Sequence, residues 1–168
     1  SADSTMPFQQ HRDIFYLSGV DQEESILVLF PDAFNEEHRE MLFLKETSEK
    51  IAIWEGEQLS KNGAFETAGI KSVYWLDQLD TVLKIIMAQA EHIYINTNEH
   101  TRAITIVETR EDRFIKRLKA DYPAHGFKKS APIMHQSRSV KESIELDLMQ
   151  RACNITEKGL RRILGFIK

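Results

Sequence analysis

The hydrophobic pattern changes its period along this chain of 168 residues, and that change limits the possible folds most. Residues 26–30 form an unbroken apolar run that ends at Pro31, which is typical of a buried strand. Residues 76–86 instead place leucines and an isoleucine three or four positions apart, as an amphipathic helix does. Because strands and helices alternate through the middle of the chain, the sequence predicts an α/β domain with a substantially buried sheet.

Further apolar stretches complete the expected order of elements. Strands are expected at residues 14–17, 26–30, 41–44, 51–54, 73–75 and 92–95. The first four follow one another closely, so part of the sheet should be antiparallel. Helices are expected within residues 57–69, 76–86 and 103–119. The residues of 103–119 expected to face the core are Ile104, Val107, Ile115 and Leu118.

The end of the chain gives the clearest helix signal. Ser139 and Glu142 form an S-x-x-E capping box, which predicts a helix start. The apolar face that follows consists of Ile144, Leu148, Ala152 and Ile155.

Composition and charge argue against several classes of function. The net charge is −4 and no long basic run occurs, so a nucleic-acid partner is not indicated. The longest apolar run is only about five residues, far too short to span a membrane. The single cysteine, Cys153, allows no internal disulfide and fits a reducing, cytoplasmic compartment. We therefore expect a cytoplasmic protein that binds neither nucleic acid nor membrane.

No residue pattern for catalysis stands out. His92 and His100 flank a strand end, but no cysteine or carboxylate pattern accompanies them. Neighbouring carboxylates such as Glu36 and Glu37 project in different directions and would not share one ion. Cys153 lies on or beside the apolar side of the last helix, which favours a structural thiol. By elimination, the residues predict an interaction or scaffold domain.

Three segments in a fixed order carry a more specific signal. Residues 1–29 contain an Ala-Asp-Ser start, a Pro-Phe pair, the stretch D-I-F-Y-L-S-G and then I-L-V-L. Residues 42–56 contain L-F-L and, further on, I-A-I-W-E-G. Residues 130–152 begin S-A-P and continue with a spaced histidine, arginine and lysine. In order and spacing, these segments resemble the N-terminal domain of aminopeptidase P (Xaa-Pro aminopeptidase) and its link into the catalytic domain.

This resemblance implies a creatinase-like N-terminal fold, a three-layer arrangement in which helices flank a mixed β-sheet. It implies that residues 1–132 form the N-terminal domain and that residues 133–168 form the link and the first helix of the catalytic domain. The opening strand and helix of the family are expected to lie ahead of this sequence, which would then be cut at both ends. Among the departures, Gln58 stands where members often have arginine, and His11-Arg12 stand where an Asn-Ser pair is common.

The resemblance also implies what the parent protein does. Members of the family release an N-terminal residue that precedes proline. They use two divalent metals, most often manganese, which activate a water and polarise the scissile carbonyl. The metal ligands of the family belong to the catalytic domain, beyond Lys168. This chain is therefore expected to hold no catalytic residue and no metal ligand, and to be inactive alone.

Three residues are implied to have a role in assembly or at the active-site entrance. Trp54 matches a tryptophan that in some members reaches toward the active site of an adjacent subunit, and core packing is its alternative reading. Arg138 and Lys141 are implied to dock the link onto the catalytic domain, or else are solvated charges before a helix. Trp75 has no such match and is expected to pack in the core.

The implied partners are the chain's own catalytic domain, further copies in a dimer or tetramer, and proline-containing peptides. The alternative function is a stand-alone peptide- or protein-binding module without catalysis, because some histone-chaperone relatives use the same pair of domains in that way.

Overall fold

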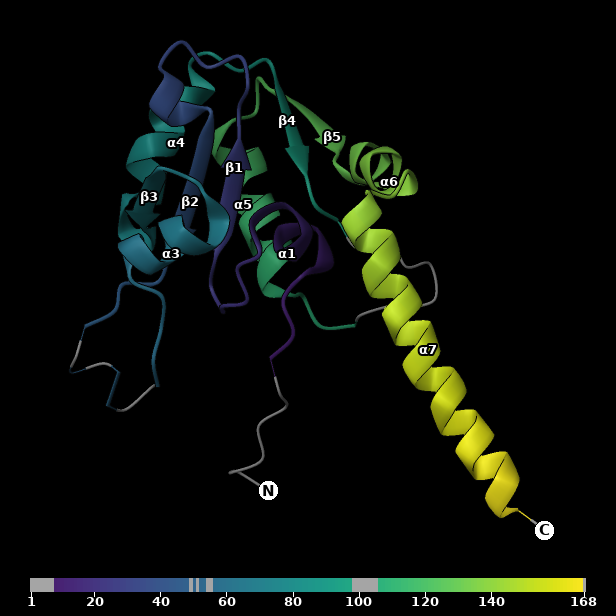
Figure 1. Cartoon of the computed structure of the whole chain (residues 1–168). Helices are drawn as coiled ribbons and strands as arrows, with labels where there is room; N and C mark the ends of the chain where they lie inside the picture. The colour runs from purple at the N-terminus through teal and green to yellow at the C-terminus, as the bar shows by residue number, and fades with distance from the viewer. Residues whose placement is uncertain (1–7, 49, 51, 54–55, 98–105, 168) are drawn as a thin grey trace. The chain divides into compact units, whose positions relative to one another are not determined.

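The computed structural model describes residues 8–48, 50, 52–53, 56–97 and 106–167 (Figure 1). The chain divides into two compact units. The first comprises residues 1–93 and 117–127, and the second comprises residues 94–116 and 128–168. The first unit holds the main sheet, and the second holds the long C-terminal helix.

Three strands form the sheet of the first unit, in the order β1-β2-β3. β1 (Ile26–Leu29) and β2 (Glu40–Leu44) are antiparallel, and the short helix η1 (Glu36–His38) lies in their connection. β3 (Ser72–Trp75) runs parallel to β2. A parallel pair needs a long connection, and α3 (Lys61–Ala68) lies within it. The sheet is therefore mixed, as expected.

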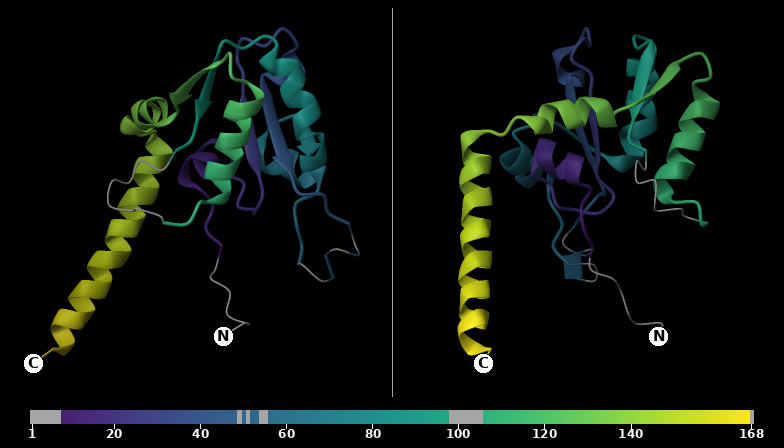
Figure 2. Two further views of the ribbon diagram at one scale, coloured as in Figure 1. Left: turned by 180° about the vertical axis from the view of Figure 1, so that it is seen from behind. Right: turned by 90° about the vertical axis from the view of Figure 1, so that its right-hand side faces the viewer.

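Helices cover both faces of this sheet (Figures 1 and 2). α1 (Arg12–Ser18) and α3 lie on one face, and α4 (Leu79–Met87) lies on the other after the short helix η2 (Leu76–Gln78). α1 and α3 both end at a glycine with a φ near +70°, a conformation that costs glycine little. α4 confirms the predicted amphipathic helix, and its buried residues are Leu79, Val82, Leu83, Ile86 and Met87.

β2 lies at the centre of the core. All four residues from Met41 to Leu44 are 0% exposed, and such a continuous apolar strand is expected where both faces of a sheet are covered. Phe43 stacks on Tyr74 of the neighbouring strand, with ring centres 5.3 Å apart. One buried cluster consists of Val20, Leu42, Leu44, Ala64 and Ile70. Trp75 packs against that cluster, as expected for a core residue.

The remaining elements are a small sheet and three helices. β4 (His92–Ile95) pairs with β5 (Gly126–Lys129) in a two-stranded sheet. α5 (Arg110–Asp121) precedes β5, and α6 (Ala131–Ser139) follows it. α7 (Ser143–Phe166) is 24 residues long and has no buried residue. Within the described ranges, no helix is long and apolar enough to cross a membrane.

Two of the predicted strands are wrong. Residues 14–17 belong to α1, where the Ser18 hydroxyl donates a hydrogen bond to the Ile14 carbonyl (2.7 Å). Ala52 and Ile53 are helical, and the Ala52 N–H donates to the Ser48 carbonyl (2.9 Å). An apolar run of four residues fits either a strand or one side of a short helix, so local hydrogen bonds decided both cases.

The predicted start of the last helix is also wrong. Ser139 ends α6, and its hydroxyl donates to the Gln136 carbonyl (2.8 Å). The N-cap of α7 is Glu142, whose N–H donates to the Glu145 carboxylate (2.9 Å).

The core residues expected in 103–119 are partly confirmed. Leu118 is buried and Ile115 is half-buried, but Val107 is 79% exposed because it precedes α5. Ile104 lies outside the described residues.

Candidate functional site

The expected entrance residue, Trp54, lies outside the described residues. The chain before it is helical at Ala52 and Ile53, and the side chain of Ile53 is 78% exposed. The Gly56 N–H donates to the Ala52 carbonyl (3.0 Å), and Gly56 has a φ of 85°. That left-handed conformation favours glycine, so Gly56 ends this helical turn.

Gln22 holds the chain that follows Gly56. Its side-chain Oε1 accepts a hydrogen bond from the Leu59 N–H (2.7 Å). Its backbone carbonyl accepts from Gln10 Nε2 (2.9 Å) and from the Ser25 hydroxyl (2.6 Å). Leu59 also packs against the buried cluster beside β2. The position of Leu59 is therefore fixed by a hydrogen bond and by apolar contact. Sequence reasoning missed Gln22, because a polar residue in a polar turn carries no motif.

The structure brings Arg138 and Lys141 together at the junction between α6 and α7. The Lys141 ammonium donates to the Arg138 carbonyl, close to the last turn of α6. A cation is favourable at the C-terminal end of a helix, where carbonyl groups lack helical partners. Lys141 therefore has a local role in ending α6, whatever else it contacts.

The described residues do not fit a dinuclear metal site. In the ranges that the structure describes, no group of three or more histidine, cysteine, aspartate or glutamate side chains could hold a metal ion. His100 of the histidine pair considered in the sequence lies outside those ranges. His125 donates from Nε2 to the Met87 carbonyl (2.8 Å), so that nitrogen is committed to the end of α4. No catalytic step is therefore assigned to these residues.

One groove in the first unit contains charged groups from α4 and the end of α5. Arg117 pairs with Asp80, with the guanidinium nitrogen 3.0 Å from the carboxylate oxygen. Burial, followed by the charges of Asp121 and Asp80, raises the pKa of Tyr122 above its ordinary value of 10.0. The groove is lined by Asp80, Leu83, Lys84, Arg117, Leu118, Asp121 and Tyr122. Its charges are balanced within the groove, and a raised tyrosine pKa does not make a base at neutral pH.

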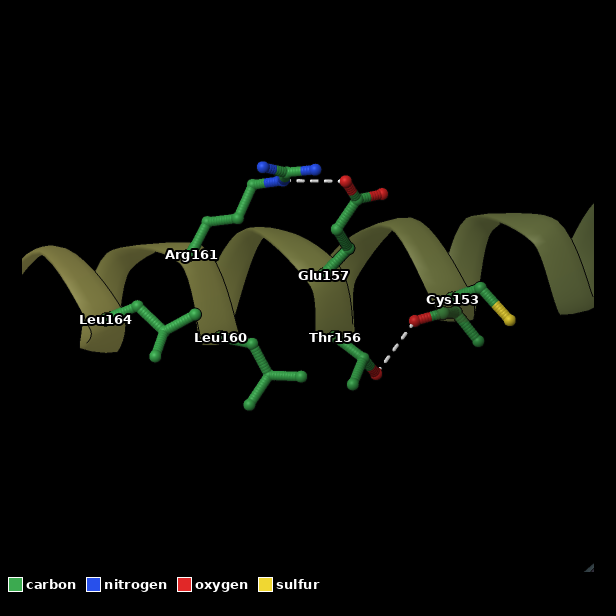
Figure 3. A pocket seen from close by; sticks show the side chains of 7 residues that line it. Cys153, Thr156, Glu157, Leu160, Arg161 and Leu164 are labelled. Carbon is green, nitrogen blue, oxygen red and sulfur yellow. Dashed lines mark hydrogen bonds and ion pairs between the residues drawn. The ribbon is translucent and has the colours of Figure 1, made fainter.

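The surface of α7 carries a shallow apolar hollow (Figure 3). Leu160 and Leu164 project from one side of the helix, and Arg161 pairs with Glu157 on the other side at 2.7 Å. The full lining is Ala152, Cys153, Thr156, Glu157, Leu160, Arg161 and Leu164. Cys153 is exposed, and the only histidine, lysine or arginine in this lining is Arg161, so the thiol has no base beside it there. The hollow has the character of a contact surface.

A covered mixed sheet, followed by a helix with an exposed apolar surface, defines an α/β domain whose described residues offer contact surfaces and no metal centre. Residues 1–94 match the family model described as "Aminopeptidase P, N-terminal domain", and the chain belongs to this family. The resemblance and the fold class expected from the sequence are both confirmed.

Relatives extend the similarity to nearly the whole chain. The Xaa-Pro aminopeptidase of Escherichia coli K12 is 26% identical over 165 residues, which is 98% of this chain and 37% of the relative. A Bacillus anthracis structure assigned to aminopeptidase P is 25% identical, with a TM-score of 0.81 over 95% of this chain and 38% of that one. Zinc-substituted E. coli aminopeptidase P in complex with product gives a TM-score of 0.69 at 23% identity, over 93% of this chain and 36% of that one. The chain thus spans little more than a third of the length of these relatives.

Proposed function

We propose that this chain is the non-catalytic N-terminal part of a metal-dependent Xaa-Pro aminopeptidase, which releases an N-terminal residue that precedes proline. One combination carries the proposal: residues 1–94 match the family's N-terminal domain, while the described residues lack a metal-binding group. The parent would use two divalent ions, with manganese as the proposed metal, held by residues outside this chain. A solved relative with zinc and product supports a metal-dependent parent.

Within the parent, this part would serve subunit assembly and would shape the active-site entrance. Residues 1–132 would form the N-terminal domain, and residues 133–168 would lead into the catalytic domain. Trp54 would reach the entrance, possessing the large stiff ring that excludes water from a bound peptide. Arg138 and Lys141 would dock the junction between α6 and α7, and their mutual contact supports an ordered junction. The partners would be the catalytic domain and further copies in a dimer or tetramer.

A second candidate is a stand-alone module that binds peptides or proteins without catalysis. The exposed apolar surface of α7 favours it, because contiguous apolar surface of this kind marks an interaction site. The two candidates differ in their dependence on metal. A module of this kind would bind a proline-containing peptide in the presence of a chelator, whereas the aminopeptidase part would neither bind nor cleave it alone.

The deciding experiment is hydrolysis of a short Xaa-Pro peptide, with and without manganese, by this chain and by a longer product of the same gene. We expect no cleavage by the 168-residue chain and manganese-dependent cleavage by the longer product. A peptide with alanine in place of proline is the matched control and should not be cleaved by either. Metal-dependent cleavage by the short chain would overturn the proposal, and chelator-resistant peptide binding would favour the second candidate.

A further inference from the structure

Gln22 places a long polar side chain inside the first unit, where only 9% of it is exposed. Its Oε1 accepts from the Leu59 N–H at 2.7 Å, across a sequence separation of 37 residues. Its Nε2 is buried and has no hydrogen-bond partner. A buried donor without a partner lowers stability about as much as a hydrogen bond raises it. The contribution of Gln22 to stability is therefore a poor reason for a glutamine at this position.

The turn that carries Gln22 is itself tightly constrained. Gln10 Nε2 donates both to the Gln22 carbonyl (2.9 Å) and to the Ser25 hydroxyl (2.9 Å). Glu24 has a φ of 55°, in the left-handed region that residues other than glycine rarely adopt. Such a backbone persists only where the surroundings hold it in place. The Gln22 side chain thus starts from a fixed backbone.

The other end of the contact is equally defined. Leu59 packs against the buried cluster, and Ser60 caps α3 by accepting from the Gly63 N–H (3.1 Å). Gly63 has Leu59 Cδ2 3.6 Å from the position that a Cβ would take. The Gln22 contact is therefore the last link between a rigid turn and a rigid helix start. The chain that enters this link comes from Trp54 and Gly56 in the sequence.

We propose that Gln22 is a positioning residue for the active-site entrance. Its Oε1 fixes the Leu59 N–H and with it the path of the chain that leads from Trp54 into α3. Trp54 thereby keeps one position at the entrance instead of several. This inference rests on the proposed function, because that function assigns Trp54 to the entrance. The acceptor oxygen does this work, so a glutamate at position 22 should keep it and a methionine of similar length should lose it.

The first measurement is amide hydrogen exchange in the 168-residue chain. In Q22M, exchange at Leu59 should be about tenfold faster, which corresponds to the loss of one ordinary hydrogen bond. In Q22E it should stay near the wild-type rate. Q89L is the matched control, because Gln89 Oε1 accepts from the Phe34 N–H (3.2 Å) elsewhere in the same unit. It should speed exchange at Phe34 and leave Leu59 unchanged.

The second measurement reports on Trp54 itself. In a W75F background, where Trp54 is the only tryptophan, Q22M should shift the fluorescence emission, and Q22E and Q89L should not. In the longer product, Q22M should raise KM for an Xaa-Pro peptide with kcat unchanged, and Q22E should restore KM. A merely structural role would lower the thermal midpoint and leave KM unchanged in the folded enzyme.

The outcomes separate this inference from the proposed function. If the longer product cleaves no Xaa-Pro peptide, the proposed function falls, while Leu59 exchange and Trp54 emission still decide whether Gln22 positions this chain. If Q22M leaves both at their wild-type values, or if Q89L changes them equally, the positioning role is overturned. Should Q22M fail to fold, Q22E alone decides: slow exchange at Leu59 supports the role, and fast exchange overturns it.

Discussion

Two histidines and a glycine fix the backbone where the first unit's chain turns into β5. His125 donates from Nε2 to the carbonyl of Met87, the last residue of α4 (2.8 Å), and this satisfies a carbonyl that the helix itself leaves without a donor. Because a carbonyl only accepts, the proton of the neutral imidazole resides on Nε2. The next residue, Gly126, lies against His92 so closely that a Cβ would come within 2.8 Å of its Cδ2. Space, and not backbone conformation, requires glycine here.

The substitution Gly126→Ala tests that reading. The backbone of Gly126 is not in the left-handed region, so alanine should fit except for its contact with His92. We expect G126A to lower the free energy of unfolding by about 1 kcal/mol through overpacking, and H92A to change it little. The double variant G126A/H92A should recover most of the loss, measured by urea unfolding. A double variant as unstable as G126A alone would mean that another contact requires the glycine.

At the scale of elements, the sequence predicted what burial imposes and missed what local hydrogen bonds impose. β2 and α4 were predictable because a strand buried on both faces and a helix buried on one leave distinct apolar periods. β5 was not predicted, since its residues are G-F-K-K and only Phe127 is partly buried. α1 was assigned to a strand because neither its N-cap, His11, nor its end at Gly19 appears in an apolar pattern.

The candidate site follows the same division. Trp54 was singled out because family resemblance preserves an aromatic residue in a recognisable string. Gln22 left no such trace, because its role depends on a contact 37 residues away. Arg138 and Lys141 were singled out as docking charges, yet their contact with each other at the end of α6 could not be read from spacing alone. Long-range partners of polar side chains become visible only once the chain is folded.

The start of α5 gives a prediction for pH. Asp112 accepts from the Thr109 hydroxyl (2.7 Å) and from the Thr109 N–H (3.0 Å), and its own N–H donates to the Thr109 hydroxyl (3.1 Å). The first two bonds favour the carboxylate and hold the pKa of Asp112 below its ordinary value of 3.8. Since the folded pKa is the lower one, this stabilisation is present above 3.8 and is lost as the pH falls through the folded pKa.

Asp112→Asn removes that titration and measures its effect. At neutral pH the wild type should be more stable than D112N, and the difference should shrink once the pH falls below 3.8. Urea unfolding at several pH values gives the difference directly. T109A is the control background, in which D112N should have a smaller effect because the hydroxyl partner is gone. A difference that is constant across the acid range would contradict the proposed bonding of the carboxylate.

At the scale of the whole molecule, the two units differ in how they bury apolar side chains. The first unit encloses β2 completely, whereas α7 in the second unit buries none of its residues. The apolar side chains of α7 that remain more than half exposed are Ile144, Leu146, Leu148, Met149, Ile155, Leu160, Ile163, Leu164 and Phe166. Apolar surface of this extent belongs to proteins that bury it against something else. The stability of the chain alone should therefore come from the rest of the fold, while α7 supplies surface.

Truncation tests this division of roles. A chain that ends at Lys141 keeps the lysine that closes α6 and loses only α7. Its thermal midpoint should equal that of the whole chain within experimental error, and it should bind less of a dye that reports exposed apolar surface. A chain that ends at Ser130 also loses Ala131 and Met134, which α6 buries, and should melt at a lower temperature. A lower midpoint already at the first truncation would show that α7 packs on the fold and that its apolar residues are not available to a partner.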